Sequence, residues 1–209
     1  MSIITRPANL AIAKAGQRMG QRRYDLNGGS DSTGAAQVRL FGPPRWTMTL
    51  QAPEAVTIAE ADVWQTMLLQ LRGRVNHLAA WDESRPAPLG TMRGTLTLNS
   101  TAVAGDVALS VTGGAGQAGT TLRAMDWLQV GSGLGSQLVK VTGNATANGS
   151  GVIAIAIEPP LRTGYASGTA VAWSQPVAHF KSQNDDTDWR NWGSRAVQGL
   201  TLDLLEQWS

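Results

Sequence analysis

The stretch Leu68 to Thr91, LLQLRGRVNHLAAWDESRPAPLGT, contains the end of a helical pattern, a short apolar run and a polar loop. We expect Gly73 to end the helix, because glycine adopts a left-handed backbone at a helix C-terminus without steric cost. Val75 to Trp81 then has the composition of a half-buried strand. The stretch contains no catalytic motif. We expect the rest of the fold to be arranged around it.

A capping box predicts where the helix begins. Thr57 and Glu60 have the spacing at which each side chain accepts a hydrogen bond from an otherwise unpaired amide of the first turn, so the helix should start near Ile58. The chain carries no other strong helix signal. The apolar stripe of this helix, at helical spacing, is Val63, Trp64, Met67, Leu68 and Leu71.

The loop at residues 82–90 contains Pro86 and Pro88. Each proline fixes its backbone φ angle and removes a hydrogen-bond donor. We therefore expect an ordered, extended arm with Trp81 at its base.

The composition describes a globular chain with little charge. Its 209 residues allow one large β domain or two smaller ones. Charged residues make up 15%, against about 25% in an ordinary soluble domain, which suits a subunit packed against others. The chain has no cysteine, which excludes disulfides and thiolate metal sites and fits a reducing cytosol.

Charge and hydropathy predict neither a nucleic-acid patch nor a membrane segment. The formal net charge is +2, and the interrupted cluster of Arg18, Arg22 and Arg23 is interpreted as a solvated face. No apolar run reaches the roughly 18 residues that a membrane span needs, and the first residues lack the apolar core of a signal peptide. We expect no simple export signal and no membrane anchor.

The region before the helix predicts several strands. Residues up to Gly34 indicate one or two, with Asn27-Gly28 as a possible hairpin turn. Gln37 to Phe41 and Arg45 to Gln51 are predicted strands joined by a turn at residues 42–44. The alternating residues on one face of the second strand are Trp46, Met48 and Leu50.

From Thr95 to Trp173 the composition shifts to few charges and many glycines, threonines and valines. Short strand-like runs separated by turn signals are typical of a small β-barrel or sandwich. These runs are Leu96–Leu98, Val107–Val111, Trp127–Val130, Leu138–Val141, Val152–Ile157 and Ala170–Trp173. A final strand within Ala196 to Leu204, with Val197, Leu200, Leu202 and Leu204, should rejoin the first domain.

The predicted fold class is therefore mainly β, with a split β-barrel or sandwich flanked by one α-helix, plus an inserted small β-barrel or sandwich module. Residues 1–94 are assigned to the first part of the outer domain. Residues 95–175 form the inserted module, and residues 176–209 return to the outer domain.

Several patterns that resemble functional motifs are interpreted as structural. Gly131 to Ser136 lacks the spacing of a phosphate-binding loop and precedes a strand-like run, so it is interpreted as a hairpin loop. His77 and His179, the only histidines, are interpreted as packed or surface residues rather than metal ligands. The chain also lacks a Gly-x-Ser-x-Gly elbow. We predict no catalytic residue, no cofactor and no metal, and hence no enzyme.

Two acidic clusters leave an alternative open. Asp82-Glu83 and residues 185–188 are interpreted as solvated loops or subunit contacts, since the second cluster lacks the glycine and distal glutamate of a calcium loop. A weaker hypothesis makes Asp82 and Glu83 the carboxylates of a cell-wall hydrolase. The eight tryptophans favour protein interfaces or core over sugar binding.

Five short motifs carry a family resemblance through their order and spacing: LRGRV at residues 71–75, AWD at 80–82, RPAPLGT at 85–91, DWLQVG at 126–131 and EPPLR at 158–162. Together they resemble the distal tail or minor tail proteins of long-tailed bacteriophages, over residues 45–205. In that family a β ring domain is flanked by one helix, and a second β module faces outward.

The resemblance implies a structural protein of the virion tail tip, assembled in the bacterial cytoplasm into a ring expected to be hexameric. Its partners would be other copies of itself, the tail tube protein, the tail-tip hub and other minor tail proteins. Phage DNA would pass non-specifically through the channel. The alternative is a carbohydrate- or receptor-binding module of the tail tip. The expected subunit interface is Arg72, Arg74, Trp81, Asp82, Glu83, Arg85, Pro86 and Pro88.

Overall fold

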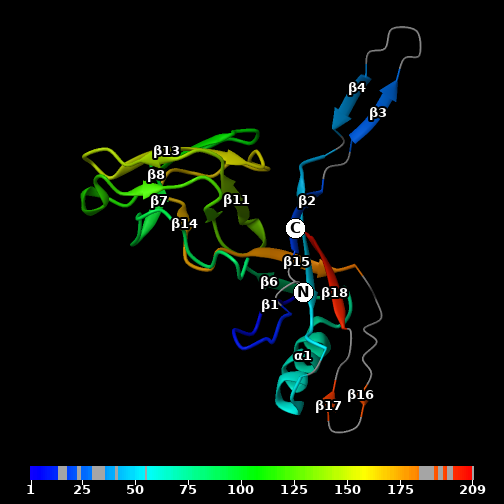
Figure 1. Cartoon of the computed structure of the whole chain (residues 1–209). Coiled ribbons are helices and arrows are strands. Elements are labelled where there is room, and N and C mark those ends of the chain that lie inside the picture. The colour runs from blue at the N-terminus through cyan, green and yellow to red at the C-terminus, as the bar shows by residue number, and fades with distance from the viewer. Residues whose placement is uncertain are drawn as a thin grey trace.

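A computed structural model of the chain describes residues 1–13, 18–22, 25–29, 36–40, 42–54, 56–183, 191–192, 195–196 and 200–208. The described chain confirms the predicted fold class. It is mainly β, with a six-stranded sheet, one flanking α-helix and a closed barrel of six strands (Figure 1). All barrel strands lie between two sheet strands in the sequence, so the barrel is inserted into the chain order of the sheet.

The six-stranded sheet combines strands from both ends of the chain. In spatial order they are β1 (Ile3–Thr5), β6 (His77–Ala80), β15 (Ala178–Ser182), β18 (Thr201–Glu206), β5 (Arg45–Gln51) and β2 (Arg18–Arg22). β1 is parallel to β6, and the other neighbouring strands are antiparallel. Because β18 lies between β15 and β5, the last strand rejoins the first sheet as predicted. Val197 lies outside the described residues.

Helix α1 (Ile58–Leu71) begins where the capping box predicts. The Glu60 amide donates to Thr57 Oγ1 at 3.3 Å, and the Thr57 amide donates to Glu60 Oε2 at 2.7 Å. The predicted stripe packs against the sheet, with Val63 half-buried and the other members buried.

The end of α1 agrees with the prediction. Gly73 is left-handed, with a φ of 63°, and directly follows the C-cap residue Arg72, which has a φ of 49°. Asn76 bonds back to the last turn of the helix. Its amide donates to the Leu71 carbonyl at 3.1 Å and its side chain donates to the Gln70 carbonyl at 2.8 Å.

Strands β2 and β5 begin a long antiparallel ladder. It continues as β3 (Asp25–Gly29) and β4 (Ala36–Leu40), which pair with each other and project away from the sheet and the barrel (Figure 1). One prediction is wrong here. Asn27 and Gly28 lie inside β3, where they pair with Val38 and Gln37, rather than in a turn. The strands predicted at residues 37–41 and 45–51 are confirmed as β4 and β5, which pair with β3 and β2 respectively.

The barrel confirms all six strands predicted for the insert, with small shifts at their ends. Its strands, in order around the barrel, are β10 (Trp127–Val130), β11 (Gln137–Val141), β13 (Val152–Glu158), β8 (Ala108–Thr112), β7 (Leu96–Leu98) and β14 (Ala170–Ala172). Aliphatic side chains such as Leu109, Val139 and Ile155 fill the interior. Met92, which precedes the predicted start of the module, also packs in this core.

Short elements complete the described chain. They are the strand pairs β9 (Thr121–Leu122) with β12 (Ala145–Thr146) and β16 (Asn191–Trp192) with β17 (Arg195–Ala196), and the 3-10 helices η1 (Ala115–Gln117) and η2 (Gly133–Gly135). The second 3-10 helix lies in the loop between β10 and β11, where Val130 pairs with Gln137. This arrangement confirms that residues 131–136 form a hairpin loop.

Candidate functional site

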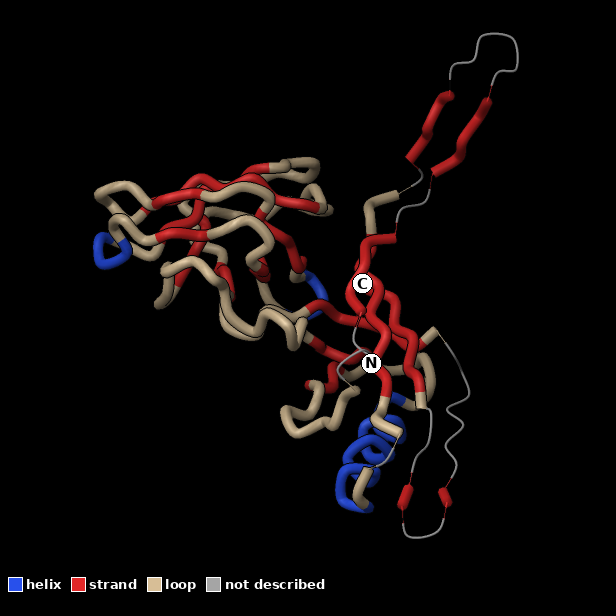
Figure 2. Tube along the Cα trace, in the orientation of Figure 1, coloured by secondary structure: helices blue, strands red, loops and turns tan. Residues whose placement is uncertain are grey.

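The sheet and the barrel lie side by side as two β units (Figure 2) and meet through a pair of tryptophans. Trp46 of β5 and Trp127 of β10 are both buried, with ring centroids 4.8 Å apart at an interplanar angle of 76°. This edge-to-face geometry suits the charge distribution of aromatic rings. Trp46 Nε1 also donates to the Leu138 carbonyl at 2.9 Å, so one side chain is fixed to two barrel strands.

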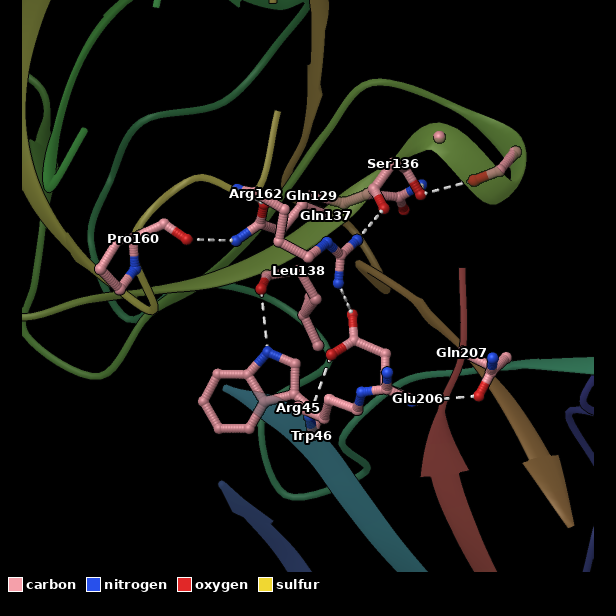
Figure 3. Close-up of polar contacts among 12 residues, drawn as sticks. Arg45, Trp46, Gln129, Ser136, Gln137, Leu138, Pro160, Arg162, Glu206 and Gln207 are labelled. Atoms are coloured by element: carbon pink, nitrogen blue, oxygen red, sulfur yellow. Dashed lines mark hydrogen bonds and ion pairs between the residues drawn. The ribbon is translucent and has the colours of Figure 1, made fainter. Parts of the chain in front are cut away.

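A buried ion pair crosses the same junction, close to Trp46 (Figure 3). Arg162, which follows β13, donates from Nη1 to Glu206 Oε1 of β18 at 2.6 Å, and from Nη2 to the Ser136 carbonyl at 2.7 Å. The other Glu206 oxygen accepts the Trp46 backbone amide at 2.9 Å. One carboxylate oxygen therefore joins the barrel to the sheet through Arg162, and the other is held within the sheet by the Trp46 amide.

Burial raises the pKa of the Glu206 carboxyl, although the nearby Arg162 guanidinium and the Trp46 amide favour its charged form. A buried ion pair of this kind fixes the relative position of two elements more clearly than it adds stability. The position suits a rigid joint. It does not suit proton transfer, because both oxygens already have partners within the chain.

Trp208 extends the junction toward the C-terminus. The guanidinium carbons of Arg162 and Arg45 lie 3.9 Å and 4.6 Å from its ring centroid, within the range of cation–π contacts. Arg45 Nη1 also donates to the Gln207 side chain at 3.2 Å. The ring of Trp208 is therefore engaged by two arginines of its own chain.

The segment at residues 81–93 connects the sheet to the barrel and is anchored by Asp126. This fully buried carboxylate accepts the amides of Leu89 at 2.8 Å and Gly90 at 3.1 Å, and it lies 3.7 Å from Arg85 Nη1. A Cβ atom at Gly90 would overlap the Thr121 carbonyl oxygen, so the segment passes very close to the barrel backbone. The proline arm is thus ordered by contacts with its own chain.

The start of this segment rests on a buried arginine. The guanidinium of Arg6 stacks on Trp81 at 3.9 Å from the ring centroid and forms an ion pair with Glu83. Burial lowers the pKa of Arg6, while Glu83 favours its charged form. Asp82, in turn, accepts Trp127 Nε1 at 3.1 Å. Asp82 and Glu83 therefore have structural partners within the chain.

The residues predicted at the subunit interface divide into two groups. Trp81 and Pro88 are buried in the single chain, and Asp82 and Arg85 are half-buried. Arg72, Arg74, Glu83 and Pro86 are exposed. The exposed arginines lie at the C-terminal end of α1, and Glu83 and Pro86 lie on the connecting segment, so the structure does not bring all eight together.

The two histidines pack on neighbouring strands of the sheet. His179 pairs opposite Ala79, two residues from His77, and both imidazoles are buried. Burial, together with His77 and Arg162, lowers the pKa of His179 to about 4. Burial also lowers the pKa of His77, helped by Lys181 and the N-terminal amine. These rings are neutral core residues near neutral pH.

Within the described chain, no three histidine or acidic residues gather as a metal site. No helix in the same ranges is long and apolar enough to cross a membrane. The acidic cluster at residues 185–188 lies outside the described residues.

Six tryptophans have described side chains, and none is strongly exposed: Trp46, Trp64, Trp81, Trp127, Trp173 and Trp208. Trp173, like Trp208, is only half-buried, and it lies 4.9 Å from the Arg93 guanidinium carbon. Sugar-binding tryptophans need an open ring face. The described tryptophans therefore give no support to the carbohydrate-binding alternative.

Four of the motifs that carried the family resemblance contribute to the junction and the connecting segment. DWLQVG contributes Asp126 and Trp127, and EPPLR contributes Arg162. AWD contributes Asp82, which accepts Trp127 Nε1, and the amides of RPAPLGT bond to Asp126.

Sequence reasoning missed Arg6, the partner of Trp81 and Glu83, and Glu206, the partner of Arg162. For Glu206 the available signal was a charged residue directly after the apolar pair Leu204-Leu205, where a free buried charge would be costly.

The fold and the junction define a two-unit β protein with a rigid joint. No family model matches the chain, and no match is found among curated proteins.

Proposed function

We propose that the protein is a structural subunit of a phage tail tip that assembles into a ring, expected to be hexameric. The ring connects the tail tube protein to the tail-tip hub and neighbouring minor tail proteins, and DNA passes through its channel without sequence-specific contacts. The proposed location is the virion, after assembly in the bacterial cytoplasm. The polypeptide has no enzymatic role in this proposal.

One observation supports this proposal above the others: the ribbon of β3 and β4 extends beyond the body of the chain (Figure 1). A two-stranded hairpin is at best marginally stable in water unless another element covers it. Neither the sheet nor the barrel provides that cover in the described chain. A neighbouring subunit is the simplest source of it.

The outer strands of the sheet are consistent with contacts between different surfaces of neighbouring copies. β1 and β2 form opposite edges of the six-stranded order. Edge strands with unpaired backbone groups readily pair with another chain. Contacts between two different surfaces close into a ring when the rotation from copy to copy closes, and otherwise build an open filament.

Deleting the ribbon tests the proposal. Arg22 and Arg45 are paired at the end of the β2–β5 ladder, so residues 23–44 can be replaced by Asn-Gly, the preferred two-residue hairpin turn. We expect the full chain to form a closed oligomer in light scattering and native mass spectrometry. The ribbon-deleted variant should stay monomeric while keeping its melting temperature within a few degrees.

Two results would contradict the proposal. A full-length chain that remains monomeric at all accessible concentrations would remove the ring. A ribbon-deleted variant that still forms the same ring would show that the ribbon is not the contact element. Negative-stain images of the full-length assembly would give the symmetry directly.

A further inference from the structure

An open pocket lies at the C-terminal end of α1, next to the edge strand β1. It has a volume of about 400 Å³ and is lined by Ile4, Thr66, Leu69, Arg72 and Asn76, among others. Leu69 is 67% exposed although it is aliphatic. The pocket thus combines an apolar wall with a guanidinium at its rim.

This end of the helix is basic. Arg72 is exposed, and Arg74, whose guanidinium donates to the Gln183 carbonyl, lies beside Lys181 in a second pocket of about 300 Å³. Among the described residues, neither pocket lining includes a carboxylate. The helix dipole contributes only about half a negative charge at its C-terminus, so the arginines outweigh it.

The opposite end of the same helix is acidic and also carries an exposed aliphatic side chain. Ile58, the first helical residue, is 58% exposed. Glu54, Glu60 and Asp62 surround this end, and Glu54 and Asp62 are exposed. Three carboxylates exceed the roughly half positive charge of the helix N-terminus.

The opposite charges at the two ends of α1 cannot pair with each other within one chain. Ile58 and Leu69 are separated by 11 helical positions, which places them about 16 Å apart along the axis and within about 20° of the same direction around it. One helix face therefore presents an acidic apolar end and a basic apolar end together. Complementary charges on one chain, held apart by a rigid element, select a second copy as the partner.

We propose that the acidic end of α1 in one subunit docks into the basic pocket at the end of α1 in the next. Ile58 enters the pocket beside Leu69, and Asp62 and Glu54 approach Arg72. The contact is between two different surfaces, which is the kind of contact that a closed ring requires beyond two subunits. This inference rests on the proposed ring and names one of its subunit contacts.

Charge reversal with complementation tests the contact. Arg72→Glu makes both helix ends acidic, and Asp62→Lys weakens the acidic end. We expect each variant alone to need at least a tenfold higher protein concentration for ring assembly. An equimolar mixture of the two should recover assembly, because in an alternating ring half of the contacts join two unmodified ends and the other half join two ends with reversed, still opposite, charges. The matched control is Arg123→Glu on an exposed barrel position, which should assemble as the unmodified chain does.

A separate variant tests the apolar part of the proposed contact. Ile58→Ser should weaken assembly with no loss of melting temperature, whereas Val107→Ser, at a similarly exposed barrel position, should leave assembly unchanged. Circular dichroism of every variant checks that α1 is retained.

The outcomes separate this contact from the ring itself. An unmodified chain that forms no oligomer contradicts the ring and the contact together. An unmodified ring that survives Arg72→Glu and Ile58→Ser contradicts the contact alone. An assembly that stops at two copies shows that the helices pair symmetrically, and this also overturns the contact between different ends.

Discussion

The barrel and the sheet differ in how each fills its core. The barrel core is mostly aliphatic, and all its members come from residues 92–171. The sheet core contains Trp46 and Trp64 and also includes Trp127 and Leu138, which belong to barrel strands. The barrel therefore supplies its own core, whereas the sheet borrows part of its core from the barrel. The insert is a structural support for the domain that surrounds it.

Separating the two units should produce the largest effect. We predict that a fragment of residues 89–175 folds cooperatively by itself, while a chain in which residues 91–174 are replaced by a short Gly-Ser linker does not. The second chain loses Trp127 and Leu138 from its core and leaves Glu206 without Arg162. Thermal unfolding followed by circular dichroism measures both. Cooperative unfolding of the barrel-deleted chain would refute the dependence.

Breaking the ion pair at the junction should have the next largest effect. Arg162→Met leaves the buried Glu206 charge uncompensated, and we expect a loss of about 3–5 kcal/mol in the free energy of unfolding at pH 7. Glu206→Gln should cost less, because an amide oxygen can still accept the Trp46 amide.

The pH dependence of Arg162→Met provides the check. Burial already raises the pKa of Glu206, and removal of the guanidinium should raise it further. The folded state then holds a proton that the unfolded state releases, so the stability of the variant should rise as the pH falls from 7 toward 5. Urea titrations at three pH values measure this change. A variant whose stability falls in parallel with the unmodified chain would contradict the assignment.

A smaller effect is expected where the connecting segment crosses the barrel. In Gly90→Ala the new Cβ overlaps the Thr121 carbonyl oxygen and lies 2.7 Å from Leu122 Cα, and both are backbone atoms that cannot rotate away. We predict a loss of about 1–3 kcal/mol in urea denaturation. Gly143→Ala, where nothing lies within 4 Å of the new Cβ, is the matched control. Equal stability of the two variants would contradict the close approach.

The same contrast explains which features the sequence could predict. The barrel strands are short, apolar and separated by glycine turns, and helix α1 has a capping box. Local patterns were therefore sufficient to predict these elements from the sequence. The pairing of β3 with β4 was missed because Asn27-Gly28 resembles a local turn, although both residues lie within β3. The junction was missed because nothing local links Arg6 to Trp81 or Arg162 to Glu206.

The smallest predicted effect concerns His179, which lies on the sheet side of the junction. Its pKa of about 4 in the folded chain lies below the ordinary value of 6.5, chiefly through burial and then through His77 and Arg162. Between these two values the unfolded state binds a proton that the folded state does not. Stability therefore falls as the pH falls, by about 1 kcal/mol between pH 6.5 and 5.5.

Glu206 acts in the opposite direction, because its raised pKa lets the folded state take up a proton at higher pH than the unfolded state does. The His179 contribution is therefore isolated by comparing slopes rather than absolute stabilities. In His179→Gln the free energy of unfolding should fall less steeply between pH 6.5 and 5.5 than in the unmodified chain, with Glu206, His77, Arg162 and Lys181 unchanged in both. Urea denaturation at 0.25-unit pH intervals resolves about 1 kcal/mol over this range. If the two slopes coincide, the His179 imidazole is not a neutral core group, and the sheet owes its pH response to another residue.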